Sequence, residues 1–156
     1  MLENLKLKMA TLTDLPAIAK VGDELFDHVI KIDRAKEFLM DDRHHLVLAF
    51  DADQIVGMAS GFHYVHPDKD PVLFINEVGV LERYQNQGIG RTVVRHLYAH
   101  GKQFGCQEAW IATEESNQAA RKAYLAAGGE EEKELVVLIN FSGTMDGRKV
   151  ERSLNS

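Results

Sequence analysis

Apolar and polar residues follow two different periods along this chain. Leu5, Leu7 and Met9 alternate with polar neighbours, which is typical of a strand with one buried face. Val93, Val94 and Leu97 keep the spacing of an amphipathic helix. Together these patterns predict a strand at 4–10, helices at 13–26 and 32–40, strands at 46–50, 55–66 and 72–80, a helix from 89 to 101 or 105, a strand at 109–113, a helix that ends at 128–129, and a final strand at 135–141.

Capping residues predict where two of these helices begin. Thr13 is expected to cap the first helix, with Pro16 in its first turn, where proline is tolerated. Asn117 is expected to cap the last helix, which Gly128 and Gly129 end.

The most informative segment lies between the strand at 72–80 and the helix that starts at residue 89. It reads Gln85-Asn86-Gln87-Gly88-Ile89-Gly90-Arg91. Glycines let a ligand approach the backbone closely, and a helix start offers free N–H groups and a positive dipole end to an anion. The dinucleotide fingerprint would need a third glycine and the P-loop a Gly-Lys-Ser/Thr, and both are missing. The segment predicts a phosphate-bearing ligand; the alternative is a plain turn.

Two segments together resemble the GCN5-related N-acetyltransferases (GNAT). The loop matches that family's Gln/Arg-x-x-Gly-x-Gly/Ala signature, which holds the pyrophosphate of acetyl-CoA, with Gln85 where arginine is frequent. Residues 117–128 match its later motif, Asn-x-x-Ala-x-x-x-Tyr-x-x-x-Gly, at every anchor. The two motifs are far more specific together than either is alone. A closer resemblance is to the aminoglycoside 3-N-acetyltransferase branch, through the hairpin, residues 63–69 and the acidic strand before Gly79.

The resemblance implies an α/β (α+β) GNAT fold. Its central sheet is mixed and mostly antiparallel, with about six strands, helices on both faces, and a fourth and fifth strand that separate to admit the pantetheine arm. We expect residues 1–141 to form one acetyltransferase domain and residues 142–156 a loosely ordered tail, because the tail has little apolar content.

The candidate catalytic residues are Glu77 and Tyr124. An alkyl amine is mostly protonated at neutral pH, so a carboxylate within reach, directly or through water, helps to generate the nucleophile. Partial burial in an apolar strand would raise the pKa of Glu77 toward a useful value; the alternative is a solvated glutamate that points away from the core. The resemblance makes Tyr124 the general acid near the thioester sulfur, and its alternative is a packed helix aromatic.

The resemblance also implies which residues bind acetyl-CoA. Backbone groups of the strand would pair with the pantetheine arm, and loop N–H groups with the charge of Arg91 would bind the pyrophosphate. Asn117 would contact the arm by its side chain or only cap its helix. The set is Val78, Gly79, Val80, Gln85, Asn86, Gln87, Gly88, Ile89, Gly90, Arg91 and Asn117.

The histidines do not predict a metal site. His96 and His100 stand one helical turn apart, but no glutamate completes a zinc-hydrolase pattern and no third ligand can be named. His44, His45, His63 and His66 are candidates for the border of the acceptor site, against surface or capping roles.

Composition limits the partners. A net charge of -6 argues against a nucleic-acid surface and suits a cationic substrate, and no apolar run is long enough to span a membrane. No signal peptide is visible, so a cytoplasmic location is expected. The single cysteine, Cys106, is expected to be a buried small side chain. A homodimer is expected from the resemblance, and an exposed final strand could pair between subunits.

The sequence does not identify the amine that accepts the acetyl group. We expect a small primary amine, with aminoglycosides and other polyamines as the leading class because acidic residues occupy predicted loops. The alternatives are a protein or peptide N-acetyltransferase, which needs an open groove, and a non-catalytic acetyl-CoA-binding module, which would have lost the acid and base. The fold does not choose between them.

Overall fold

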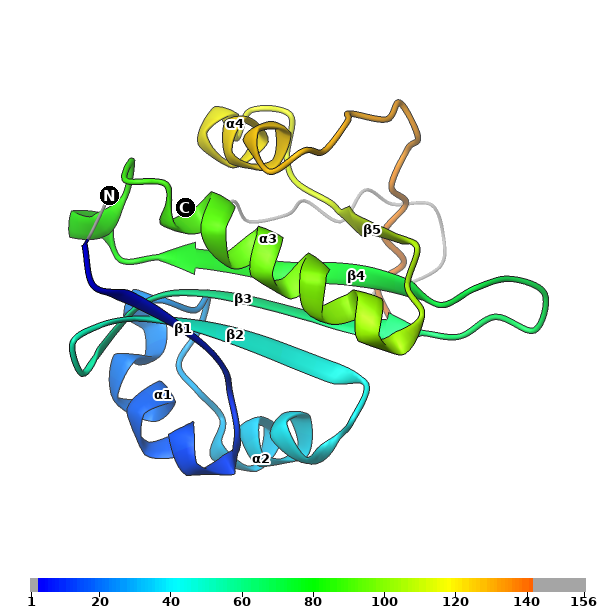
Figure 1. Ribbon diagram of the computed structural model, residues 1–156. Coiled ribbons are helices and arrows are strands. Elements are labelled where there is room, and N and C mark those ends of the chain that lie inside the picture. Colours follow the sequence, from blue (N-terminus) through cyan, green and yellow to red (C-terminus); the bar gives the residue numbers. More distant parts are fainter. Residues whose placement is uncertain (1–2, 142–156) are drawn as a thin grey trace.

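The computed structural model describes residues 3–141, and in this part of the chain one five-stranded sheet has helices on both faces (Figure 1). The strand order is β1-β2-β3-β4-β5. All neighbouring strands are antiparallel except β4 and β5, which are parallel. The strands are β1 (Leu5–Met9), β2 (His44–Asp51), β3 (Gln54–Tyr64), β4 (Val72–Val80) and β5 (Glu108–Ile111).

Four α-helices cover the two faces. Helices α1 (Leu15–Val21) and α2 (Ile32–Met40) lie on one face, and α3 (Ile89–Gly101) lies on the other, with α4 (Gln118–Ala126) beside it (Figure 1). Short 3-10 turns adjoin these helices at Leu12–Asp14, Gly22–Glu24, Glu82–Tyr84 and Lys102–Phe104. None of the described helices is long and apolar enough to cross a membrane.

The buried core fills the space on both sides of the sheet. Leu73 of β4 and Leu97 of α3 are both fully buried, and Cys106 is buried as predicted. Gly57 permits the close contact between β3 and α3, because a Cβ there would lie 2.6 Å from Cγ2 of Ile89.

The expected sequence of elements is confirmed from residue 5 to residue 126, with two changes in the first helix. Predicted to run to about residue 26, α1 ends at Val21, because Gly22 leaves the helical region with φ 45°. Thr13 is not the cap: Asp14 holds the N-cap position of α1, and its Oδ2 accepts the backbone N–H of Thr11 at 2.8 Å.

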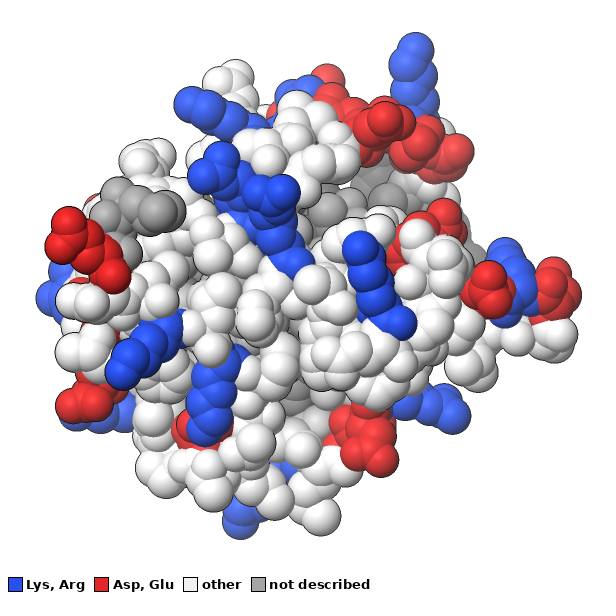
Figure 2. Space-filling view, viewed as in Figure 1, with Lys and Arg blue, Asp and Glu red and all other residues white. Residues whose placement is uncertain are grey.

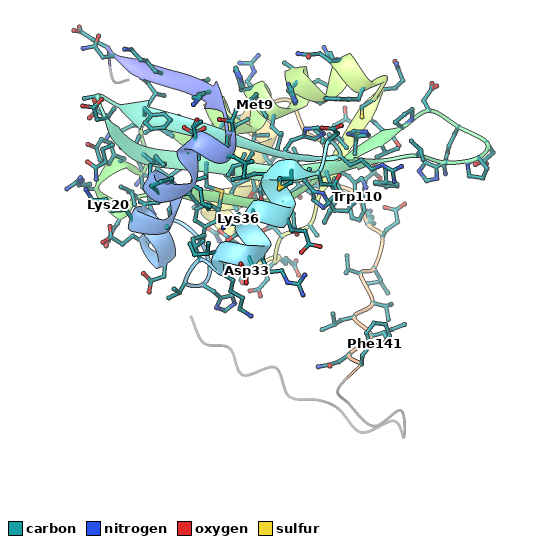
Figure 3. The ribbon with its side chains drawn as sticks, turned by 90° about the horizontal axis from the view of Figure 1, so that it is seen from below. Met9, Lys20, Asp33, Lys36, Trp110 and Phe141 are labelled. Atoms are coloured by element: carbon teal, nitrogen blue, oxygen red, sulfur yellow. The ribbon has the colours of Figure 1, made fainter. Side chains whose placement is uncertain are left out.

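The predicted final strand at 135–141 is wrong. Residues 129–140 have no regular secondary structure, and the side chains of Leu135 and Phe141 are 91% and 100% exposed. Figure 3 shows Phe141 well away from the body of the protein. A strand forms only when a neighbour supplies hydrogen bonds, and this segment lies along no strand of the described chain. The expected tail at 142–156 lies outside the described residues.

A register shift in β4 sets which side chains share a face. Ser60 of β3 faces Glu77, but the next residue, Gly61, faces Ile75, so Asn76 is an extra residue in the ladder. Simple alternation would put Leu73 and Val80 on opposite faces, yet both contact α3. After the shift, Glu77 therefore points to the α1 and α2 side of the sheet.

The fourth and fifth strands separate near this point. Pairing between β4 and β5 runs from Val72 opposite Glu108 to Ile75 opposite Ile111. The second half of β4, residues 76–80, pairs with β3 only. The edge of β4 that leads to the glycine loop is therefore left without a strand partner.

Candidate active site

The glycine loop joins β4 to α3 through two residues with left-handed backbone. Asn86 has φ 61° and Gly88 has φ 82°, and Gly88 is the N-cap residue of α3. Asparagine tolerates this region and glycine adopts it without strain, whereas a β-branched residue does not. The loop sequence thus forms this turn because of the residues at these two positions.

The start of α3 presents a row of unused donors. The backbone N–H groups of residues 86–91 donate to no other residue of the described chain, and the first helical bond runs from the N–H of Thr92 to the carbonyl of Gly88 at 3.0 Å. The hydroxyl of Thr92 donates to the same carbonyl at 2.9 Å. Free N–H groups at the positive end of a helix dipole are suited to bind a pyrophosphate.

Loop side chains divide between holding the loop and facing outward. The side-chain amide of Gln85 donates to the carbonyl of Val80 at 3.2 Å, and that of Gln87 donates to the carbonyl of Arg83 at 3.4 Å. Arg91 is exposed, and its Nη2 lies 3.6 Å from where a Cβ on Gly88 would be. Lys and Arg side chains gather over the first turns of α3 (Figure 2). An anion would therefore meet backbone donors and Arg91.

Glu77 of β4 is half-buried on the sheet face that α1 and α2 cover, opposite the face that α3 covers. Its Oε1 accepts the backbone N–H of Asp27 at 2.7 Å. Burial raises the pKa of Glu77, the charge of Asp27 raises it further, and the hydrogen bond from the Asp27 N–H opposes the increase. The net effect is a pKa above its ordinary value, as a general base for amine chemistry requires.

Gly79 explains why Asp27 reaches Glu77. A Cβ on Gly79 would collide with the carbonyl oxygen of Leu25. Only glycine at position 79 therefore allows the segment after α1 to lie directly against β4. Gly79 is one of the residues predicted to bind acetyl-CoA, and Asp27 is not among the predicted site residues. No local pattern in the sequence connects residues 25–27 with residues 77–79.

Tyr124 reaches the region from the α3 side. It lies on α4, is half-buried against the core, and burial raises the pKa of its hydroxyl. Ala123 of the same helix would be 4.0 Å from a Cβ on Gly90, which places α4 beside the start of α3. Glu77 and Tyr124 therefore lie on opposite faces of the sheet, Glu77 on the side of α1 and α2 and Tyr124 on the side of α3.

Replacing Tyr124 by phenylalanine tests its predicted role as general acid. Because only the hydroxyl is lost, we expect kcat to fall about tenfold while affinity for acetyl-CoA changes little. Steady-state kinetics and direct cofactor titration measure the two effects separately. An unchanged kcat would remove Tyr124 from the mechanism and leave it as a packed aromatic residue.

The other predicted cofactor residues occupy positions of two kinds. Val78 and Val80 lie in the half of β4 that lacks a strand partner on the β5 side, where backbone groups can pair with a ligand. Asn117 caps α4, since its Oδ1 accepts the N–H of Ala120 at 3.1 Å. Its predicted contact with the pantetheine arm stays a prediction.

Three histidines and a phenylalanine form a cluster at the far end of α3 from the glycine loop. Nε2 of His45 and Nδ1 of His63 are 2.8 Å apart, and both rings pack on Phe104, as does that of His100. An adjoining hollow of about 350 Å³ is lined in part by His44, His45 and Phe104. In the described residues no group of three His, Cys, Asp or Glu side chains could hold a metal ion. The cluster is separate from the loop and from Glu77.

Protonation of His45 is expected to make stability depend on pH. Burial lowers the pKa of His45 from 6.5 to about 4. Between these values the unfolded chain binds a proton that the folded chain does not, so the free energy of unfolding falls as pH falls, by up to about 3 kcal/mol. Urea unfolding at pH 7 and pH 4.5 measures the difference. His45→Gln should reduce this pH dependence; an unaltered dependence would contradict the assignment.

Comparisons with known proteins agree with this geometry. The model of the acetyltransferase (GNAT) family matches residues 9–128. A search of curated proteins found no match. A solved structure of an aminoglycoside acetyltransferase from an uncultured soil metagenomic sample, in complex with sisomicin, is similar with a TM-score of 0.78 and 17% identity, over 87% of this chain and 95% of that one.

Two further structures show how widely the fold is used. An aminoglycoside N-acetyltransferase, AAC(6')-Iy, in complex with CoA has a TM-score of 0.75 and 20% identity, over 88% of this chain and 95% of that one. A protein described as a transcriptional regulator from Bacillus halodurans C-125 has a TM-score of 0.73 and 21% identity, over 88% and 100%. At these identities the likeness establishes the fold and leaves the substrate open.

The chain belongs to the GNAT acetyltransferase family. It is an acyltransferase. The fold predicted from the two motifs is confirmed, with five strands in the described residues where about six were expected. The extent of the domain, 1–141, and the individual roles of the site residues stay predictions, as does the similarity to the 3-N branch.

Proposed function

We propose that this enzyme transfers the acetyl group of acetyl-CoA to the primary amine of a small cationic molecule, with aminoglycosides as the first class to test. The observation that carries the proposal is the environment of Glu77. A half-buried carboxylate with a raised pKa stands on β4, next to Asp27 and beside the strand edge that leads to the glycine loop. This position suits a base that takes a proton from an incoming amine.

The residues present fit the donor. The N–H groups of residues 86–91 and the guanidinium of Arg91 would hold the pyrophosphate, and the backbone of Val78 and Val80 would pair with the pantetheine arm. When bound, acetyl-CoA supplies the activated thioester. Gly88 leaves the backbone accessible to a ligand, because a Cβ on this residue would have no neighbour within 4 Å except Nη2 of Arg91.

The proposed reaction is a direct transfer. Glu77 accepts one proton from the acceptor ammonium, directly or through water, and the freed nitrogen lone pair forms a bond to the acetyl carbonyl carbon. The bond from that carbon to sulfur then breaks, the electron pair leaves with the thiolate, and the nitrogen releases its second excess proton to solvent. Tyr124 donates a proton to the thiolate and regains one from solvent. The products are an acetamide and CoA.

A small cationic acceptor is supported by charge and by one structural relative. The net charge is -6, and Asp27 and Glu77 place two carboxyl groups at the site. The similar metagenomic enzyme was crystallised with sisomicin. A peptide acceptor is the alternative among enzymes, and a non-catalytic acetyl-CoA-binding module is the alternative from another class; retention of both Glu77 and Tyr124 argues against the module.

The first test is thiol release from acetyl-CoA with a panel of aminoglycosides, polyamines, amino acids and short peptides, and a control without acceptor. Turnover on an aminoglycoside at low concentration is the expected result. Turnover only on peptides would favour the first alternative. Binding of acetyl-CoA without turnover on any amine would favour the module.

An exposed apolar segment suggests how the protein assembles. The apolar side chains of residues 135–139 are exposed and belong to no strand of the described chain, so the segment is available to pair with a second copy in a homodimer. Sedimentation of the full chain against a chain that ends at residue 134 would test this, because loss of the dimer is expected. We also propose a cytoplasmic protein without nucleic-acid or membrane partners.

A further inference from the structure

Four aromatic side chains form a continuous row on the same sheet face as Glu77. Phe62 and Tyr64 come from β3, Phe74 from β4 and Trp110 from β5, and we call them the aromatic shelf. Phe62 is opposite Phe74 in the β3–β4 register, and Phe74 is opposite Trp110 in the β4–β5 register. Since opposite residues share a face, the shelf spans three neighbouring strands.

Contacts within the shelf hold its rings in fixed orientations. The ring centroids of Phe74 and Trp110 are 4.3 Å apart, and those of Phe62 and Phe74 are 5.4 Å apart. The indole N–H of Trp110 donates to the hydroxyl of Tyr64 at 2.8 Å. This bond satisfies the polar edge of the indole and fixes the plane of its ring, so that little side-chain entropy remains to be lost on binding.

The shelf is open to ligands. Trp110 is 47% exposed, and Figure 3, which looks onto the α1 and α2 side, shows it beyond α2. Phe62, Tyr64 and Phe74 are partly exposed. The exposed face of Trp110 is available to pack against a flat ring of a ligand.

Position connects the shelf to the candidate base. The register shift at Asn76 puts Phe74 and Glu77 on one face, and Phe74 and Trp110 lie just before the point where β4 and β5 stop pairing. An amine beside Glu77 would therefore have the remainder of its molecule over the shelf. The carboxyl groups of Glu77 and Asp27 at this end suit the ammonium group, and the rings suit what is attached to it.

We propose that the aromatic shelf is the acceptor-binding surface, and that it selects primary amines carried on or next to a six-membered ring. The inference rests on the proposed function and narrows its substrate class. An aminosugar ring and an aromatic ring share the required chemistry, a flat face of C–H or π surface that packs against indole and phenyl rings. An acyclic polyamine can use the carboxyl groups but cannot cover the shelf.

Trp110 is the only tryptophan of the chain, so its fluorescence reports binding at the shelf without any turnover. The probes are kanamycin, 2-phenylethylamine and spermidine, each titrated with CoA present and without it. We expect a saturable change in emission with at least one ring-bearing amine, and at least about tenfold weaker binding of spermidine. The two ring-bearing probes distinguish an aminosugar from an aromatic acceptor.

Two variants test whether the rings of the shelf stack on the acceptor, and a third variant is a control for effects unrelated to stacking. Phe74→Leu keeps apolar volume but removes a ring, and should weaken binding of the ring-bearing amine about fivefold with no change in acetyl-CoA affinity. Trp110→Leu, at an exposed position, should raise the KM for that amine about tenfold. Tyr98→Ala is the matched control, because Tyr98 is an exposed aromatic residue on α3 and lies outside the shelf. It should change neither value.

Failure of the aromatic shelf as the acceptor-binding surface can be told apart from failure of the proposed acetyltransferase reaction. Absence of an emission change with both ring-bearing amines would overturn the shelf even if thiol release occurred. Equal affinity for spermidine, or unchanged affinity and KM in both shelf variants, would do the same. A saturable emission change without thiol release on any amine would support the shelf and count against the acetyltransferase reaction proposed for these acceptors.

Discussion

Replacing Gly88 by valine is expected to weaken acetyl-CoA binding by about ten- to a hundredfold. Gly88 has φ 82°, which a β-branched residue adopts only at a cost of about 1–3 kcal/mol. The new side chain would also stand beside the free N–H groups of residues 86–91, where the pyrophosphate is predicted to bind. Isothermal titration with CoA measures the loss directly.

Gly105 provides a control with matched strain. It has φ 86° at the opposite end of α3, and a Cβ there would make only ordinary contacts, 3.7 Å from Cδ of Pro71. Gly105→Val should lower the thermal midpoint about as much as Gly88→Val while CoA affinity is retained. Equal CoA affinity in Gly88→Val and wild type would refute the assignment of the loop to pyrophosphate.

Replacing Glu77 by glutamine is expected to lower kcat/KM about a hundredfold near neutral pH, because the amide cannot accept the ammonium proton. In wild type, kcat/KM should fall as pH falls through the pKa of Glu77, which burial raises above 4.5. Above that pKa the carboxylate is charged and active, and below it the group is protonated and inactive. The pH profile of kcat/KM for both proteins measures this.

The difference between wild type and Glu77→Gln should be largest at the low-pH end of the range where Glu77 is still ionised, since the free amine is scarcest there. Glu37→Gln is the control, because Glu37 is an exposed residue of α2 paired with Arg34. Parallel pH profiles for wild type and Glu77→Gln would show that Glu77 is not the base. The environment of Asp27 would then need another explanation.

Local patterns predicted most of the elements. The strand at 72–80 and the helix at 32–40 were predicted at their observed bounds, and the helix from 89 ends at 101, the first of its two predicted ends. Each has an apolar run or period between clear breaks. The glycine loop was predicted for the same reason. Its conformation depends on Asn86 and Gly88, and its donors come from the start of the helix that follows.

Elements whose existence or bounds depend on residues far away in the sequence were predicted less accurately. Residues 135–141 have the composition of a strand, but composition does not supply the neighbouring backbone that a strand requires. The early end of α1 at Val21 goes with Gly22, whose φ of 45° takes the backbone out of the helical region.

The sequence by itself determined the glycine loop and the family, since both depend on residues that are close together in the chain. Only the tertiary structure decided where Glu77 points. The extra residue at Asn76 reverses the alternation of β4, and Gly79 lets residues 25–27 cross the strand, so that the carboxylate meets the N–H of Asp27 and shares a face with Phe74. The close backbone approach joins segments about 50 residues apart, and the register is set by pairing between β3 and β4. For that reason no local pattern contains either of them.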